Sequence, residues 1–211
     1  MKRVLVLAAF LVGATALPAS AGSITIDSTN CNSSAGCYGL SWTLDVSSGS
    51  FVGVGGTYEY MARLVITDDP FSSTVSSGQI ISAVTFKATD DINEYELFSA
   101  PAGTGPWTNS LHNLSSSGCS GNGSGFICAQ TTGTEVTTGG TQTFVWLFNS
   151  DDDAVGVNGD TMHIGAKLTT IDPYVPGRLL SAYATVPEPT SLSLLGIGLF
   201  GLAGTLRRRR K

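Results

Sequence analysis

The sequence predicts an all-β exported domain, an antiparallel β-sandwich or jelly roll, flanked by a hydrophobic helix at each end of the chain. Between residues 22 and 185, apolar side chains recur with a period of two, which is typical of β-strands. Clusters of Gly, Ser, Asn, Asp and Pro separate these runs, as turns do. Long uncharged apolar runs occur only near the termini, at 4–17 and 191–206.

The N-terminus has the three parts of a secretory signal peptide. Lys2 and Arg3 precede the apolar run 4–17, and Ala19-Ser20-Ala21 fits the small-x-small pattern of a cleavage site. We therefore expect residues 1–21 to be a signal helix that is removed by a cut before Gly22. The rest of the chain would then leave the cytoplasm.

Residues 22–185 have the length of one ordinary domain. This segment holds four basic and fifteen acidic side chains, a net charge of −11, because seven of the eleven basic residues lie in the two termini. Such a surface repels phosphate backbones, so we expect no nucleic-acid partner. It would suit divalent cations, or simply keep the domain soluble.

The predicted strands differ in how many of their faces are apolar. In the run 58–66, tyrosine and aliphatic residues share one face, and Glu59 and Arg63 occupy the other. The run 141–148 is apolar on both faces, which indicates an interior strand of a sheet. Residues 22–37 and 101–124 are low in apolar content and are expected to be loop-rich. The predicted strands are 38–46, 58–66, 80–87, 92–98, 125–129, 141–148, 162–168 and 179–185.

The residues Asn158-Gly159 give a strong short-hairpin signal between the apolar segments 155–157 and 162–164.

Four cysteines fall into two local pairs, Cys31 with Cys37 and Cys119 with Cys128. An even number in an exported chain indicates disulfides. Three connectivities are possible, and the turn-rich segments inside each pair favour the local one. A four-thiolate zinc site is disfavoured because no Cys-x-x-Cys spacing occurs.

An acidic segment at 149–160 is the best metal candidate. Calcium prefers clustered carboxylate and amide oxygens in loops, and the spacing here does not fit the EF-hand pattern. A solvated turn is the alternative. The calcium candidates are Asp151, Asp153, Asn158 and Asp160.

No residue pattern indicates an enzyme. The two histidines, His112 and His163, have no Gly-x-Ser-x-Gly nucleophile motif to accompany them. Glu94 and Glu96 share one strand face at roughly 6–7 Å, a spacing compatible with a glycosidase pair but usual for a solvated face. We predict no catalytic residues and no cofactor.

Aromatic residues could bind sugar by stacking. Trp107 follows Gly105-Pro106 and is expected in an exposed loop, where it could contact a glycan. Trp42 and Trp146 lie in apolar alternation and are expected in the core.

The C-terminal segment 186–211 has three parts in order. Pro187-Glu188-Pro189 is followed by the uncharged run 191–206, which as a helix would span about 24 Å, and then by Arg207, Arg208, Arg209, Arg210 and Lys211. Flanking cations stay on the cytoplasmic side of a membrane span. We expect a transmembrane helix; a buried core helix is the alternative.

This tail resembles the PEP-CTERM sorting signal of Gram-negative bacteria in its Pro-Glu-Pro, its Leu/Gly-rich span and its arginines 207–210. The resemblance implies an exosortase, a membrane protease-transpeptidase that cuts near Pro-Glu-Pro. It also implies transient anchoring in the membrane, and then a place at the cell surface or in an exopolysaccharide matrix, such as that of a biofilm. Two hypotheses follow for the domain: a non-enzymatic surface or matrix protein, or an exported carbohydrate-binding module or weak carbohydrate-active enzyme.

Overall fold

The computed structural model describes most of the predicted domain. The described residues are 20–29, 31, 36–68, 79–131, 136–137, 140–151, 161–170 and 178–185. The apolar run 4–17, the Asn158-Gly159 turn and the tail 186–211 lie outside them. Within the described residues, no helix is long and apolar enough to cross a bilayer.

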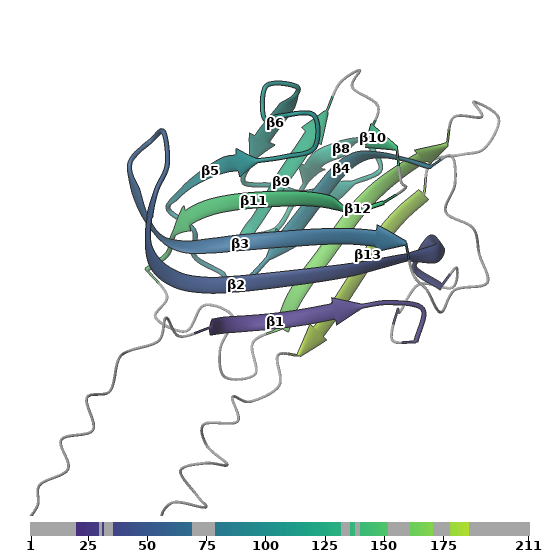
Figure 1. Ribbon diagram of the computed structural model, residues 1–211, viewed down its shortest axis with the longest axis horizontal. Coiled ribbons are helices and arrows are strands. Elements are labelled where there is room, and N and C mark those ends of the chain that lie inside the picture. The colour runs from purple at the N-terminus through teal and green to yellow at the C-terminus, as the bar shows by residue number, and fades with distance from the viewer. Residues whose placement is uncertain are drawn as a thin grey trace, which may run out of the picture.

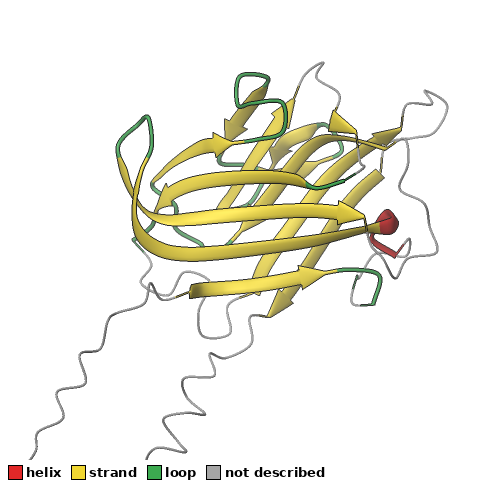
Figure 2. Cartoon of the chain, in the orientation of Figure 1, coloured by secondary structure: helices red, strands yellow, loops and turns green. Residues whose placement is uncertain are grey.

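Two antiparallel sheets form the body of the domain, which confirms the all-β, sandwich-like prediction (Figures 1 and 2). Sheet A has five strands in the order β1-β2-β3-β11-β5, and sheet B has the order β13-β12-β4-β9-β6 with β10 also paired to β4. Sheet A comprises β1 (Ser20–Ile26), β2 (Leu40–Val52), β3 (Thr57–Asp68), β11 (Gln142–Asn149) and β5 (Glu94–Ser99). Sheet B comprises β13 (Arg178–Thr185), β12 (Thr161–Thr170), β4 (Gln79–Lys87), β9 (Phe126–Thr131), β6 (Trp107–Ser110) and β10 (Val136–Thr137).

The core lies between the two sheets and is rich in aromatic residues. Trp146 of sheet A packs on Phe86 of sheet B with ring centroids 5.0 Å apart, and Trp42 is fully buried. Trp42 and Trp146 are therefore core residues, as predicted. Burial of rings of this size dominates the free energy that holds such a sandwich together.

The period-two pattern located the strands well. All eight predicted strands are present, each displaced by at most a few residues except β2, which runs on to Val52. β11 is bonded on one side to β3 and on the other to β5, as expected for an interior strand.

Two segments predicted to be loop-rich contain strands. In residues 22–37, Ile24 and Ile26 bury alternate side chains of β1 in the core, so β1 pairs with β2 at the edge of sheet A. In residues 101–124 lie β6 and a separate two-stranded sheet of β7 (Asn113–Ser115) and β8 (Gly118–Gly121). The loop expectation is therefore wrong for β1 and for much of 107–121, whereas the described residues between β1 and β2 contain no strand, as expected.

Both local disulfides are present, Cys31–Cys37 and Cys119–Cys128. The second joins β8 to β9, so it holds the small sheet against the outer face of sheet B. The first closes the turn before β2, where Cys37 and Tyr38 adopt left-handed backbone angles with φ of 52° and 57°. Because such angles are unfavourable for residues with a Cβ, the cross-link and the burial of Cys37 stabilise this turn.

Candidate functional site

The end of the β2–β3 hairpin, which we call the hairpin tip (residues 53–56), is hydrogen-bonded to β5. In Figure 1 the hairpin curls past the end of β11 and reaches β5, which is not adjacent to β3 in the sheet. A register shift between Ser48 and Phe51 on β2 accompanies this bend. Bulges of this kind increase the local twist of a strand.

The carboxylate of Glu96 on β5 holds the hairpin tip. The backbone N–H of Val54 donates to Glu96 Oε1 at 3.1 Å, and that of Gly55 donates to Oε2 at 3.0 Å. The tip has no room for a side chain at Gly53, where a Cβ would lie 2.4 Å from Glu96 Oε2. This arrangement of two N–H groups and a glycine suits an acceptor with two oxygens.

Two pKa values at this contact are displaced from their ordinary values. Burial alone would raise the pKa of Glu96, but the N–H groups of Gly55 and Val54 and the hydroxyl of Tyr58 outweigh it, so the pKa is lowered. Burial, followed by the hydrogen bond to Glu96, raises the pKa of Tyr58. Both shifts favour the pair in which Glu96 is ionised and Tyr58 is protonated.

Glu94 and Glu96 accept hydrogen bonds from different parts of the domain. Glu94 Oε2 accepts a hydrogen bond from Asn149 Nδ2 at 3.0 Å, and Asn149 Oδ1 accepts one from the backbone N–H of Glu59 at 2.8 Å. Asn149 thereby joins β3, β5 and β11 where β11 ends. Each glutamate therefore has a structural partner.

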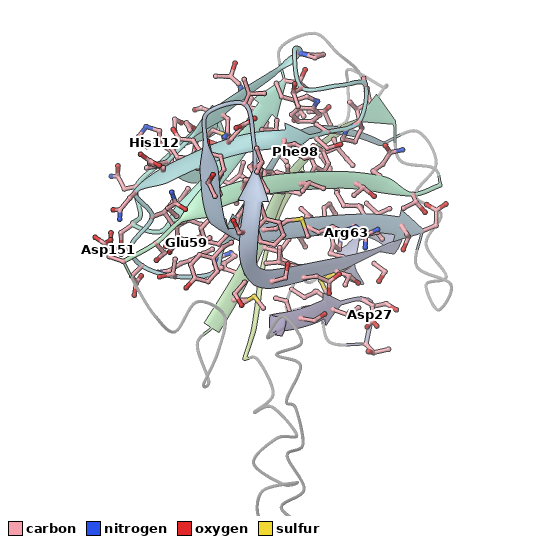
Figure 3. All side chains as sticks on the ribbon, turned by 60° about the vertical axis from the view of Figure 1, so that its left-hand side comes forward. Asp27, Glu59, Arg63, Phe98, His112 and Asp151 are labelled. Atoms are coloured by element: carbon pink, nitrogen blue, oxygen red, sulfur yellow. A yellow bond between two sulfur atoms is a disulfide. The ribbon has the colours of Figure 1, made fainter. Side chains whose placement is uncertain are left out.

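The calcium candidates fall largely outside the described residues. Asp151 is exposed and lies on the same side of the domain as Glu59 (Figure 3), while Asp153, Asn158 and Asp160 are not described. The neighbouring Ser150 is buried, and its hydroxyl donates to the carbonyl of Asp91. Among the described residues no three His, Cys, Asp or Glu side chains gather as metal ligands would.

Trp107 is not an exposed loop residue, so that expectation is wrong. It begins β6 and is only 7% exposed, with its ring edge-on to Phe144 at 4.9 Å between centroids. Its Nε1–H donates to the carbonyl of Pro101 at 3.0 Å. A buried and bonded indole cannot stack on a sugar, because the ring face is already covered by protein.

The two histidines lie in different settings. His112 is exposed between β6 and β7. His163 on β12 packs edge-on against Phe126 at 5.2 Å, and burial, with a smaller effect of the Lys87 charge, lowers its pKa.

The last described strand, β13, ends at Thr185. From that residue onward, residues 185–210 match the family described as the PEP-CTERM protein-sorting motif. The chain carries this sorting motif at its C-terminus. The PEP-CTERM motif implies that the protein is exported, processed by an exosortase and sorted to the cell surface.

Other comparisons add little. No curated protein matches the chain. A solved structure described as "pH-induced modulation of Streptococcus parasanguinis adhesion by Fap1 fimbriae" aligns with 79% of this chain and 94% of its own, at 11% identity and a TM-score of 0.39. A likeness of that size carries no argument about function.

The pairing of Glu96 with the hairpin tip could not be found in the sequence. The residues Gly53-Val54-Gly55-Gly56 indicate a turn, but the acceptor is about forty residues away. Only the curl of the hairpin past β11 brings the two together.

Proposed function

We propose that this is a non-enzymatic protein of the cell surface or of an extracellular polysaccharide matrix. It is exported with its signal peptide, held briefly in the membrane by residues 191–206, and released or transferred when an exosortase cuts beside Pro187-Glu188-Pro189. The observation that supports this proposal is the sorting motif at 185–210, which starts at the residue where β13 ends. The folded domain can therefore be complete on the exported side before the tail is processed.

The same proposal assigns no catalytic role to any residue of the domain. The acidic residues that could act as a pair, Glu94 and Glu96, are each bonded to backbone or amide groups that fix neighbouring strands. A general acid or base needs its proton free for a substrate. These bonds support a structural role for both side chains.

The test replaces Pro187, Glu188 and Pro189 by alanine in the native host and follows the protein by cell fractionation and immunoblotting. We expect an uncut precursor in the inner membrane, because the enzyme reads this peptide and not the domain. The matched control replaces the flanking Val186 and Thr190 by alanine, and this variant is expected to be processed normally. The proposal fails if the triple variant reaches the surface at its normal size.

A second variant tests the membrane topology. Deletion of residues 207–211 removes the five cations that would hold the apolar run on the cytoplasmic side. We expect more unprocessed protein to escape from the membrane into the periplasm or medium. Unchanged release would contradict the proposed anchoring.

A carbohydrate-binding module remains the second candidate. The indole that first suggested it is buried, but the outer face of sheet A offers a different surface with suitable chemistry.

A further inference from the structure

The outer face of sheet A is rich in hydroxyl groups. The inward positions of its strands are apolar, so the alternate positions face outward and lie side by side across the register. In one row, Thr25 of β1 lies opposite Thr43 of β2, and the hydroxyl oxygens of these two residues are 3.0 Å apart. Val65 of β3 and Thr143 of β11 continue the same row. We call this surface the hydroxyl face; it comprises Ser23, Thr25, Ser41, Thr43, Asp45, Ser47, Arg63, Val65, Thr67, Thr143 and Val145. It ends at the row in which the apolar outward residues Met61 and Leu147 follow Ser47 on β3 and β11.

The hydroxyl face is close to electrically neutral although the domain is strongly acidic. Its two charged residues, Asp45 and Arg63, lie opposite each other with Oδ2 and Nη1 4.0 Å apart. Ser23 Oγ also donates to Asp45 Oδ1 at 2.5 Å. Figure 3 shows Arg63 on β3.

The face is also not the kind of surface that makes a stable protein interface. Its aliphatic residues Val65 and Val145 are half-buried. Of the large hydrophobic side chains that are well exposed, Val52 and Val54 lie at the end of the β2–β3 hairpin and Phe98 lies on β5, the edge strand of sheet A beside β11. Protein interfaces concentrate aromatic and apolar residues at their centre. Two copies of a domain with a net charge of −11 would also repel each other, so a second copy is a poor occupant.

A neutral polysaccharide fits these features best. Serine and threonine hydroxyls both donate and accept, which matches the hydroxyls of a sugar. Val65 and Val145 lie among these hydroxyl groups and offer apolar contact for the C–H faces of sugar rings. The acidic remainder of the domain disfavours a polyanionic polymer, because like charges in proximity cost free energy.

We propose that the hydroxyl face binds an uncharged polysaccharide weakly along its length. This inference rests on the proposed function at the surface or in the matrix and names the polymer class that would hold the domain there. Individual hydroxyl contacts contribute little, so retention comes from many weak contacts along a polymer and from many copies of the domain.

The experiment passes the full chain in detergent over immobilised neutral polymers and over immobilised polygalacturonate. The neutral polymers are dextran, amylose and galactomannan. We expect retardation on at least one neutral polymer, no retardation on polygalacturonate, and little change between low and high salt, because no net charge is involved. Absence of retardation on all three neutral polymers overturns the proposal, as does retardation on polygalacturonate that salt abolishes.

The face itself is tested with a triple variant, Thr25→Ala, Thr43→Ala and Thr143→Ala, which removes three outward hydroxyls. We expect its retardation factor to fall roughly tenfold. The matched control carries Thr57→Ala, Thr104→Ala and Thr108→Ala, three exposed threonines away from the face, and is expected to behave like the wild type. Equal losses in both triple variants would overturn the assignment.

Thr43→Arg, which adds bulk and charge at the middle of the face, provides a second variant if the triple change impairs folding. We expect it to lose retardation on the neutral polymers while its unfolding transition is retained; full retention of binding would overturn the proposal. Cell fractionation of the same variants distinguishes a failure of polysaccharide binding from a failure of sorting. All these variants are expected to reach the cell surface normally, since the sorting motif is untouched.

Discussion

The contact between Glu96 and the hairpin tip predicts a measurable contribution to stability. Glu96→Gln keeps the size of the side chain but removes its charge and replaces one acceptor oxygen by an NH₂ group. Only one of the N–H groups of Val54 and Gly55 then has an acceptor, and the other faces a donor. Hydrogen bonds to a charged group contribute about 1.5–3 kcal/mol each when buried. Because the tip is exposed and water can replace the lost partner, we expect a total loss of about 1–2 kcal/mol.

The dependence of this loss on pH tests its cause. The pKa of Glu96 is lowered in the folded protein, so its contribution is present above its ordinary value of 4.5 and is lost as the pH falls through the folded pKa. Protonated Glu96 resembles glutamine in charge. We therefore expect the difference between wild type and Glu96→Gln to shrink as the pH is lowered below 4.5.

Urea unfolding followed by tryptophan fluorescence at several pH values measures this difference. Hydrogen exchange at the amides of Val54 and Gly55 reports on the tip directly and is expected to accelerate in the variant. Glu94→Gln is the matched control, because Glu94 is exposed and accepts from one side-chain amide; its loss is expected to stay within about 0.5 kcal/mol. A difference that does not vary with pH, or equal losses in both variants, would refute the reasoning.

Three further predictions concern the rest of the domain. Replacing Cys119 and Cys128 by alanine removes the cross-link between β8 and β9 and is expected to lower the free energy of unfolding in urea by about 2–3 kcal/mol. Amide hydrogen exchange is expected to accelerate most at residues 113–121, and unchanged protection of those amides would contradict the prediction. Gly125→Ala is expected to lower the free energy of unfolding by at least about 2 kcal/mol, because φ is +72° and a Cβ would lie 1.8 Å from the Thr89 carbonyl oxygen. The control Gly140→Ala has a similar φ of +73° but open space around the Cβ, so its loss is expected to be only about 1 kcal/mol. Because burial lowers the pKa of His163, stability is expected to fall as the pH drops below 6.5, and His163→Gln is expected to remove that part of the pH dependence.

The strands and the core could be predicted because both depend on local alternation. In β3, side chains that alternate along the sequence are buried and exposed in turn, and the aromatic residues of β11 all lie in the core on the face expected. The disulfides could also be predicted, because cysteines six and nine residues apart need only a turn between them. Each of these inferences uses information within about ten residues.

The errors arose where pairing over long distances decides the structure. The segment 107–110 follows Gly105-Pro106 and lies in a region of low hydrophobicity, so Trp107 was predicted to be exposed. It is buried because β6 pairs with β9 and turns the indole toward Phe144 of the opposite sheet. β1 was missed because its alternation, Ser23-Ile24-Thr25-Ile26, is only four residues long. The long pairing with β2 makes that short segment a strand.

The two ends of the domain link its fold to its sorting. β1 and β13 are edge strands of the two sheets, and they contact each other on one side of the sandwich (Figure 1). The predicted signal cleavage site, before Gly22, falls within the first residues of β1, and β13 ends where the sorting motif begins. Only residues 186–190 separate β13 from the apolar run, a reach of at most about 18 Å. On the proposed topology the β1–β13 side must therefore lie close to the membrane before the tail is cut. The hairpin tip and β5 lie away from that side, so they remain accessible while the chain is anchored.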